Sequence, residues 1–547
     1  RSVYQNIRRK YDIPVPPALS GLDFSFTKGG ATVSRRDCAD VASAFPKTYG
    51  QPVIKVSKSD KSLESKPFRI GCCLSGGPAA GGHNVIIGLY DKLKQIHKES
   101  SLIGFTGGPA GILNKEYVEV DDALAYKFRN MGGFDMLGSG RTKLETEEHF
   151  ETVFQTVSAL KLDGLIIIGG DDSNTTAALI AEKLKQKGST CVCIGCPKTI
   201  DGDLKVDLPE EGVAVETSFG FDSATKVYAS LVGNLMADAR SGRKYYHFVR
   251  LMVRSASHIT LEVALQTRPT VSLISEEILA KKSKISEIVS HIADVIQARA
   301  AVKKFYGVVI LPEGLVEFIP DFKVLIDYLN DILAAFKEEH KREPTKEEVV
   351  DILKSKDASS TDVFLSLPAQ FQEQLLGERD SHGNVPVSAI ETERLLASMV
   401  KAERAKRGFT KFSPQTHFFG YEGRCVEPSN FAATYCYSLG LNAAILVTAG
   451  FIGYMSVITK LYKPVKEWEP CGITIVAMFN MEKRQGKLKP VVQKALVELD
   501  GKPFRAFSAI RARSEMEDLF RNPGPIQMFG PTELCDRPTM TLLEERK

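Results

Sequence analysis

Two adjacent aspartates follow an aliphatic run and two glycines in LIIIGGDDSNTTA (165–177). Glycines between a buried strand and a helix usually form a loop in which backbone N–H groups approach a phosphate. Asp171 and Asp172 should repel that phosphate, because like charges about 4 Å apart in a partly buried site oppose each other by roughly 4 kcal/mol. A divalent cation on one carboxylate would reverse the local charge. The spacing therefore suggests a metal-assisted phosphate loop.

A second polar cluster, CPKTIDGDLK (196–205), contains Lys198, Thr199, Asp201 and Asp203. A cation, a hydroxyl and a carboxylate within four residues suit in-line phosphoryl transfer. Catalysis of that reaction is mostly positioning and charge neutralisation, with a base for the attacking hydroxyl. A polar turn in which an aspartate caps a helix explains the same residues equally well when they are taken alone.

Two further glycine-rich stretches could bind phosphate. SGGPAAGGHN (75–84) resembles a phosphate-binding turn, but it is not a Walker A loop because His83 stands where a lysine should follow Gly82. A tight strand-to-helix turn is the plain alternative. GSGRTK (138–143) places Arg141 among glycines, and an arginine there can donate two hydrogen bonds to a phosphoryl oxygen pair.

Short apolar runs alternate with helical patterns from residue 68 onward and would position these loops. Near-continuous apolar strands separated by helices indicate a parallel sheet covered on both faces, so we predict an α/β fold. Ligands bind at the carboxyl ends of strands in such sheets, and each loop above falls at such an end. The expected strand-and-loop segments are FRIGCCLSGG (68–77), SLIGFTGG (101–108), GLIIIGG (164–170), TCVCIGCPKT (190–199), YYHFVRL (245–251) and GVVILPEG (307–314).

Composition narrows the possible functions. The chain has 547 residues, enough for several domains, and a net charge of only +4. It contains no Lys/Arg block typical of nucleic-acid binding, so we expect no polynucleotide partner. The longest apolar stretch, 443–458, is too short to span a bilayer, and we interpret it as buried core. The CxxC at Cys193 and Cys196 lies in a β-type run, and we interpret the ten scattered cysteines as unpaired thiols of a cytoplasmic protein.

Eight motifs in one order carry a closer resemblance: GGDDSN, PKTIDGDLK, SFGFDSATK (218–226), KYYHFVRL (244–251), RSASHITLE (254–262), LPEGL (311–315), HFFGYEGRC (417–425) and PSNF (428–431). Together they closely resemble the pyrophosphate-dependent phosphofructokinases, specifically the long, plant-β-subunit-like group. The resemblance runs from about residue 68 to the C-terminus. It implies Mg²⁺-dependent, reversible phosphoryl transfer between inorganic diphosphate and the 1-hydroxyl of fructose 6-phosphate.

The resemblance also implies two Rossmann-like doubly wound parallel-sheet domains. We expect residues 68–240 to form a diphosphate- and Mg²⁺-binding domain, and residues 241–320 with 411–547 to form a sugar-phosphate-binding domain. Residues 1–67 are polar and form an N-terminal extension that wraps or oligomerises. Residues 321–410 are rich in Lys and Glu and should form an α-helical insertion of mostly solvated helices.

The motif match assigns roles around the donor. Gly76 resembles the diphosphate-contacting glycine and Asp171 the Mg²⁺-associated acid. Asp201 resembles the general base that takes the sugar hydroxyl proton, and Lys198 resembles a lysine that binds diphosphate. Asp172 and Lys198 stand where relatives that use ATP usually carry glycine, which leaves room for the α-phosphate of the nucleotide. Their side chains therefore favour diphosphate over ATP.

Other matched residues face the acceptor. Thr199 and Ile200 should contact substrate through the turn of Asp201. Met252, Val253 and Arg254 match a Met-Gly-Arg segment at the sugar and the transferring phosphoryl group, and Glu313, Tyr421 and Arg424 match the fructose 6-phosphate pocket. Arginines suit bidentate phosphate recognition, although singly each is more often a surface ion pair. Lys244 and Tyr245 match residues that the family contributes across a subunit interface, which implies a homodimer or higher oligomer.

Four positions depart from the family pattern. Val253 stands where the family has glycine, and a stiff β-branched residue disfavours positive φ. Ala80, Thr270 and Ala432 replace a proline, an asparagine and an aspartate. These departures motivate one alternative, a non-catalytic regulatory subunit that binds sugar phosphate. A second alternative is an ATP-dependent phosphofructokinase of similar fold.

Overall fold

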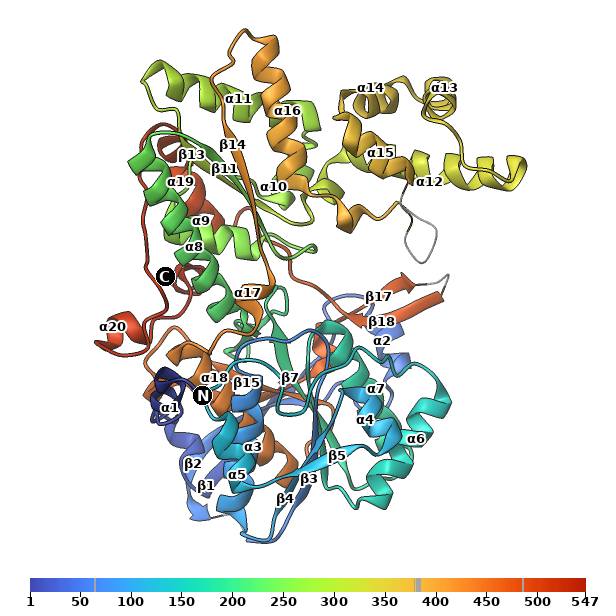
Figure 1. Cartoon of the computed structure of the whole chain (residues 1–547). Helices are drawn as coiled ribbons and strands as arrows, with labels where there is room; N and C mark the ends of the chain where they lie inside the picture. The colour runs from blue at the N-terminus through green and yellow to red at the C-terminus, as the bar shows by residue number, and fades with distance from the viewer. Residues whose placement is uncertain (63–64, 378, 380–384, 485–486) are drawn as a thin grey trace. The chain divides into compact units, whose positions relative to one another are not determined.

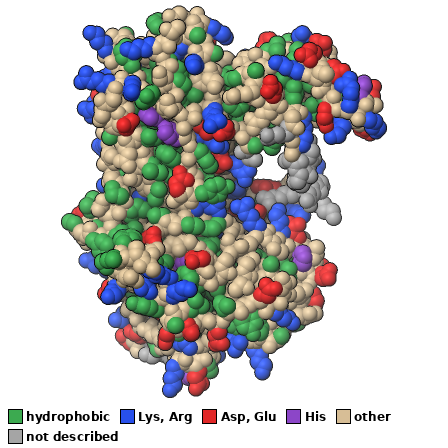
Figure 2. Space-filling view, in the orientation of Figure 1, with side chains coloured by type: hydrophobic (Ala, Val, Ile, Leu, Met, Phe, Trp, Pro, Cys, Tyr) green, Lys and Arg blue, Asp and Glu red, His purple; other side chains and the backbone are tan. Residues whose placement is uncertain are grey.

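Buried aliphatic strands lie at the centre of each of two units in the computed structural model, which describes residues 1–62, 65–377, 379, 385–484 and 487–547 (Figure 1). The first unit contains residues 1–224, 422–495 and 526–546, and the second contains 225–421, 496–525 and Lys547. Figure 2 shows Lys and Arg side chains interspersed with Asp and Glu over the visible face of each unit, consistent with the small net charge of +4.

A ten-stranded sheet forms the centre of the first unit, in the order β1-β2-β16-β15-β7-β6-β3-β4-β5, with β10 paired to β7. Strands β15, β7, β6, β3 and β4 are mutually parallel, which confirms the predicted α/β class. Both flanks of the sheet are antiparallel, which the sequence pattern did not indicate. The strands are β1 Asp23–Ala31, β2 Pro52–Ser62, β3 Arg69–Leu74, β4 Ser101–Phe105, β5 Tyr117–Val120, β6 Gly164–Gly169, β7 Val192–Thr199, β10 Phe219–Gly220, β15 Tyr454–Thr459 and β16 Glu469–Thr474.

Helices cover both faces of this sheet, α3, α5 and α18 on one side and α4, α6 and α7 on the other (Figure 1). All six residues of β6 are buried, as expected for a strand enclosed on both faces. The helices are α3 Gly82–Ile96, α4 Pro109–Asn114, α5 Asp122–Phe128, α6 Glu147–Ala159, α7 Asp171–Gln186 and α18 Asn430–Thr448. By length and composition α18 could cross a membrane, but 89% of its apolar window is buried inside the structure, as in a core helix.

Short elements complete the first unit. Two hairpins, β8–β9 and β17–β18, lie outside the large sheet. The remaining elements are α1 Val3–Arg8, α2 Cys38–Ala44, β8 Val206–Leu208, β9 Val213–Val215, α17 Tyr421–Arg424, β17 Phe479–Arg484, β18 Lys487–Val492, α20 Thr532–Cys535 and α21 Met540–Glu545. Helix α8, Phe221–Gly242, begins in the first unit and continues into the second.

The units group chain segments differently from the domain bounds expected above. Strands β1 and β2 of the N-terminal extension join the large sheet, where β2 pairs with β16. Residues 422–495, expected with the sugar-phosphate domain, belong to the first unit and supply β15, β16 and α18. Hydrophobic periodicity identifies an element but not its partner strand, so it does not specify how these segments are grouped into compact units.

The second unit contains a four-stranded parallel sheet in the order β12-β13-β11-β14. Its strands are β11 Tyr246–Leu251, β12 Val271–Ser272, β13 Gly307–Pro312 and β14 Pro414–Phe419, and its helices include α9 His258–Thr267, α10 Ser275–Lys281, α11 Ile285–Ala301 and α19 Lys502–Met516. The cysteines of the predicted CxxC lie elsewhere, buried in β7 of the first unit, where burial raises the pKa of both thiols.

The segment 321–410 is helical, but its helices are not mostly solvated. One face of α12 buries Phe322, Leu325 and Leu329 in a hydrophobic core shared with β11, β13 and α11. Helix α16 packs on β11 and β14 and buries Glu393, whose carboxylate lies 2.7 Å from Nε of Arg250. Most charged residues thus cover the outer faces of amphipathic helices, while Glu393 is buried beside Arg250. These helices are α12 Pro320–His340, α13 Lys346–Lys356, α14 Ala358–Ser366, α15 Ala369–Gly377 and α16 Thr392–Lys406.

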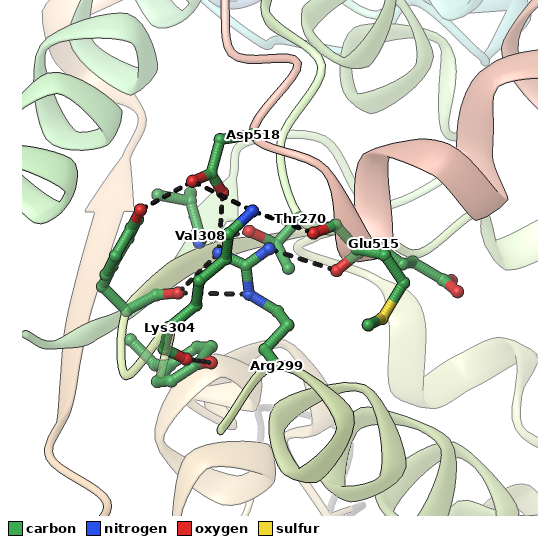
Figure 3. A network of polar contacts seen from close by, with 9 residues as sticks. Thr270, Arg299, Lys304, Val308, Glu515 and Asp518 are labelled. Carbon is green, nitrogen blue, oxygen red and sulfur yellow. Dashed lines mark hydrogen bonds and ion pairs between the residues drawn. The ribbon is translucent and has the colours of Figure 1, made fainter. Parts of the chain in front are cut away.

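A buried polar network ties the segment after α19 to the second sheet (Figure 3). The fully buried Arg299 guanidinium donates to the carbonyl oxygens of Tyr306 and Glu515 and to Asp518 Oδ1 at 2.8 Å. In the same region Oγ1 of Thr270 accepts the N–H of Val308 at 3.1 Å. Thr270, a departure from the family pattern, therefore satisfies a buried backbone donor of β13.

Candidate active site

The carboxyl ends of β3, β6 and β7 bring three predicted loops together in the first unit. These strands are neighbours in the sheet, with Leu74 beside Ile168 and Gly169 beside Pro197. The Ser173 hydroxyl donates to the Ser75 hydroxyl at 2.8 Å, which links the first turn of α7 to the loop after β3. The loops that carry Gly76, Asp171 and Asp201 therefore meet at one edge of the sheet.

Gly76 and Gly77 leave room for cationic side chains. Gly76 has φ +86°, and a Cβ added there would lie 3.3 Å from Nζ of Lys198. Lys198 Nζ donates to the carbonyl oxygen of Gly77 at 2.8 Å. A Cβ on Gly77 would lie 2.5 Å from Nη2 of Arg424 and 3.4 Å from Nη2 of Arg141. The loop after β3 thus receives three cations, an arrangement suited to a polyanionic phosphate.

Arg424 reaches the loop after β3 in the first unit. Its Nε lies 3.5 Å from the carbonyl oxygen of Pro78, and the residue belongs to the first unit. Tyr421, at the other end of the four-residue helix α17, is the last residue of that stretch of the second unit. One short helix therefore carries both residues that the motif assigned to the fructose 6-phosphate pocket.

Burial and charge act in opposite directions on the two central ionisable groups. Burial lowers the pKa of Lys198 to about 8, and Asp201 opposes that effect. Burial raises the pKa of Asp201, against the lowering effects of Lys494, of a hydrogen bond with Thr199 and of Lys198. The Asp201 N–H donates to Oγ1 of Thr199 at 3.0 Å, which fixes the turn. A carboxylate with a raised pKa beside a buried ammonium suits a general base.

Asp171 and Asp172 occupy the first turn of α7, which begins at Asp171 after Gly170. Acidic residues are favourable there because the amino end of a helix carries partial positive charge. Asp172 is exposed, whereas the Asp171 side chain is 26% exposed and lies 3.5 Å from Nζ of Lys494. The helix dipole and Lys494 thus reduce the repulsion that the sequence alone suggested.

Lys494 is a site residue that the sequence analysis missed. Its Nζ also lies 3.9 Å from Oδ2 of Asp203. Partial burial lowers the pKa of Lys494, but Asp171, Asp203 and Asp201 outweigh that effect and raise it above its ordinary value. The lysine follows β18 in the run KLKPVVQKA, which has no pattern of catalytic residues; only its long-range contacts reveal it.

The residues at this edge fit a magnesium ion that arrives with a phosphate. Mg²⁺ is usually bound through one or two carboxylates together with substrate phosphates, and it keeps several waters. Asp171 and Asp203 share the ammonium of Lys494, so their oxygens face a common cation position. Within the described ranges, no group of three His, Cys, Asp or Glu side chains could hold a metal ion alone.

Three loops of the second unit bring together the predicted sugar-side residues. Met252 N–H donates to the carbonyl oxygen of Phe419 at 2.9 Å, and Glu313 N–H donates to that of Leu251 at 2.9 Å. These residues follow the parallel strands β11, β13 and β14. A Cβ on Gly314 would lie 2.0 Å from the carbonyl oxygen of Arg254, so the loops are in direct contact.

Val253 adopts the positive φ that its glycine counterpart would favour. Its φ is +115°, its side chain is 5% exposed, and its N–H donates to Oε2 of Glu313 at 3.1 Å. A β-branched residue in this conformation is a genuine outlier and stores strain. The backbone at this position therefore keeps the hydrogen bond to Glu313 despite the substitution.

Lys244 and Tyr245 do not join these loops within the chain. They precede β11, whereas Met252, Val253 and Arg254 follow it, so the six-residue strand separates the two groups by roughly 20 Å. Tyr245 has φ +73°, and the Lys244 ammonium lies 4.7 Å from the centre of its ring.

Two remaining departures have ordinary structural positions. Ala80 is fully buried, and Ala432 donates its N–H to the hydroxyl of Ser429, the residue that caps α18. Neither contacts the catalytic candidates through a hydrogen bond of its side chain, since alanine has no polar group.

A model of the phosphofructokinase family, described as Phosphofructokinase, matches residues 69–447. The chain belongs to the phosphofructokinase family. It is 47% identical over 548 residues to a pyrophosphate–fructose 6-phosphate 1-phosphotransferase of Entamoeba histolytica, covering 100% of this chain and 99% of the relative. It is 46% identical to the β subunit of the Solanum tuberosum enzyme, covering 100% and 94%. The predicted resemblance to the long, plant-β-subunit-like phosphofructokinases is confirmed.

A solved structure agrees at the level of the phosphofructokinase fold. The pyrophosphate-dependent phosphofructokinase of Marinobacter aquaeolei superposes with a TM-score of 0.52 at 16% identity, covering 85% of this chain and 98% of that one. The plant α subunit is a more distant relative than the β subunit: the Arabidopsis thaliana α 2 subunit is 37% identical over 97% of this phosphofructokinase chain.

Proposed function

We propose that the chain catalyses reversible phosphoryl transfer from inorganic diphosphate to the 1-hydroxyl of D-fructose 6-phosphate. The products are fructose 1,6-bisphosphate and phosphate, which makes the reaction a step of glycolysis and gluconeogenesis. The observation that carries the proposal is the buried Lys198 ammonium at the Gly76–Gly77 loop, next to Asp201, in a chain whose full-length relatives bear that activity in their names.

In the forward reaction Asp201 accepts the proton of the 1-hydroxyl as that oxygen bonds to the phosphorus. The bond between the bridging oxygen and the same phosphorus breaks, and the second phosphate leaves with the electron pair. Lys198, Arg141 and Arg424 approach one loop and neutralise the charge of the diphosphate oxygens. In the reverse reaction Asp201 returns the proton to the sugar oxygen.

Asp171, together with Asp203, would hold Mg²⁺, which supplies positive charge at the phosphate oxygens when bound. Both carboxylates lie within 4 Å of one ammonium, so they can direct oxygens at a single cation. Their contribution to the site is to fix that cation beside the phosphate loop.

Candidate acceptor contacts occur in each unit: the turn of Thr199 and Ile200 in the first, and the loops after β11 and β13 in the second. We propose that Met252 and Arg254 contact the sugar and the transferring group, and that Glu313 and Tyr421 bind fructose 6-phosphate. Supporting this, Glu313 is already oriented by the N–H of Val253. Parallel-sheet enzymes bind ligands where these loops lie, at the carboxyl ends of strands.

Asp172 and Lys198 select diphosphate over ATP. The Asp172 carboxylate is exposed at the start of α7, and the Lys198 ammonium fills the space beside Gly76. An α-phosphate placed there would meet the carboxylate directly and would lack room beside the lysine side chain. The pair therefore excludes the longer donor while the lysine favours the shorter one.

Lys244 and Tyr245 lie at the opposite end of β11 from the other acceptor residues, which is the placement expected if they complete the site of a neighbouring copy. We therefore propose a cytoplasmic homodimer or higher oligomer with a substrate site shared across subunits. The alternative of a regulatory subunit is motivated by the strained Val253, and it predicts no turnover by the chain alone.

One assay tests the proposal. The purified chain is incubated with Mg²⁺ and fructose 6-phosphate, with either diphosphate or ATP as donor, and fructose 1,6-bisphosphate is measured. Turnover with diphosphate alone is the expected result. Turnover with ATP alone would contradict the donor assignment, and absence of turnover with both donors would favour the regulatory subunit.

A further inference from the structure

Lys494 lies among carboxylates that the proposed reaction uses. Its Nζ is 3.5 Å from Oδ2 of Asp171 and 3.9 Å from Oδ2 of Asp203. The Asp203 side chain is 5% exposed, that of Asp171 is 26% exposed, and that of Lys494 is 40% exposed. The ammonium therefore lies within 4 Å of both acids and offsets part of their negative charge.

The backbone around Lys494 is held by the same two elements that carry these acids. The Ala495 N–H donates to the carbonyl oxygen of Asp203 at 2.7 Å. The Val492 N–H donates to Oγ1 of Thr175, one turn into the helix that begins at Asp171, at 3.1 Å. Residues on both sides of Lys494 are thus anchored, so its position does not depend only on a long flexible side chain.

A carboxylate that already contacts an ammonium is a poorer ligand for a free divalent cation, because the two cations compete for the same oxygens and repel each other. We propose that Lys494 competes with Mg²⁺ for Asp171 and Asp203, so that the metal binds weakly to the free enzyme and tightly only together with diphosphate. This inference rests on the proposed function, which makes Asp171 a metal ligand.

Diphosphate changes this competition because its complex with magnesium is an anion. When the complex binds, the displaced Lys494 ammonium gains a phosphate oxygen as a new partner, whereas a free metal ion offers it none. Lys494 would then couple the binding of metal and donor, a coupling that is reciprocal by linkage. The enzyme would thereby avoid holding a metal in a site that contains no donor.

The test measures metal binding without turnover. Mn²⁺ serves as the probe, and its binding to the full-length protein is followed by electron paramagnetic resonance in the absence of diphosphate and sugar. We expect Lys494→Met to bind Mn²⁺ about tenfold more tightly than the wild type, which corresponds to about 1.4 kcal/mol. Lys494→Arg keeps the charge and should keep the wild-type affinity.

A lysine on the neighbouring strand provides the matched control. Lys489 of β18 has its ammonium 3.6 Å from the carboxylate of Glu145, away from the Asp171–Asp203 pair, so Lys489→Met should leave Mn²⁺ affinity unchanged. As a second readout, Mn²⁺ should raise the melting temperature of Lys494→Met more than that of the wild type. Lys494→Gln repeats both measurements if Lys494→Met does not fold.

Equal or weaker Mn²⁺ affinity after loss of the Lys494 charge would overturn the inference, and so would undetectable binding in both proteins. The variant carrying both Lys494→Met and Asp171→Asn separates this result from failure of the proposed function. If that double variant lost the gain in affinity, Asp171 would be the contested ligand. If it kept the gain, Mn²⁺ would bind elsewhere and the inference would fail even if diphosphate turnover were observed.

Discussion

Val253 offers a direct measurement of backbone strain at the acceptor loop. Its φ of +115° is accessible to glycine but rarely to a residue with a Cβ. We compare the variant with alanine and the variant with glycine at this position. We predict that the glycine variant loses much less stability relative to the alanine variant here than it does in an ordinary strand. Val249, fully buried in β11, is the matched control because it precedes the same loop in the same unit.

The magnitude follows from three contributions. A glycine variant is about 0.5–1 kcal/mol less stable than an alanine variant, because its unfolded chain has more conformational entropy. It also loses burial of one methyl group, about 0.8 kcal/mol. These terms apply at both positions and predict that Val249→Gly is about 1.5 kcal/mol less stable than Val249→Ala. At Val253 the glycine additionally relieves about 1–3 kcal/mol of strain, so Val253→Gly should be as stable as Val253→Ala or slightly more stable.

Differential scanning calorimetry of the four variants gives the comparison. The second unit is a domain of roughly 200 residues, for which 1 kcal/mol moves the midpoint by about 2–4 °C. The alanine-to-glycine steps at the two positions differ by the strain of about 1–3 kcal/mol, so their midpoint shifts should differ by about 2–12 °C. Equal steps would refute the reasoning, because they would mean that the backbone at Val253 stores no strain that glycine can relieve.

The other predictions concern charge and proton transfer. Asp201→Asn should lower kcat by about 10²–10⁴-fold with little change in KM, because it removes only the base; steady-state kinetics with diphosphate would contradict the assignment if kcat were unchanged. Asp172→Gly combined with Lys198→Gly should raise KM for diphosphate and admit ATP, and wild-type diphosphate kinetics in that variant would show that donor choice lies elsewhere. Because burial lowers the pKa of Lys198 to about 8, the ammonium loses its charge as pH rises through that value, and KM for diphosphate should increase above pH 8 in a pH–rate series. Burial lowers the pKa of His247 to about 4, and its Nδ1 lies 2.9 Å from Nε2 of His417. The unfolded state binds this proton first, so stability is full above pH 6.5 and should fall by about 3 kcal/mol as pH drops toward 4, as urea denaturation at several pH values would measure.

The sequence predicted where the candidate loops lie, because their positions depend on local pattern. The loops after β3, β6 and β7 were identified because a buried strand, a glycine turn and a helix start leave a contiguous pattern. Gly76, Asp171, Lys198 and Asp201 follow from those loops, and the parallel sheet brings them together. Which loops meet was predictable because parallel strands present their carboxyl ends on one edge.

What the sequence did not predict depends on contacts between distant segments. The pairing of β2 with β16 joins residues that are more than 400 positions apart in the chain, and no local periodicity specifies it. The insertion helices were predicted to be solvated because their composition is rich in charged residues. Burial of Phe322 and its neighbours depends instead on which helix face packs against the sheet. Lys494 was not predicted for the same reason. Its contacts with Asp171 and Asp203 join distant parts of the chain, and its neighbours in sequence give no sign of them.

Two different positive charges offset the repulsion between Asp171 and Asp172: the amino end of α7 and the ammonium of Lys494. The amino end of α7 favours both acids, but that effect is worth only about 0.3–1 kcal/mol per charge at an exposed position. For the exposed Asp172, solvent screening adds to this helix-end effect. Asp171 is more enclosed, so water screens its charge less. The Lys494 ammonium, 3.5 Å from Asp171, supplies a further favourable charge there. On the proposed function, the loop can carry two adjacent carboxylates beside a phosphate, because one is exposed to solvent and the other lies beside the ammonium of Lys494.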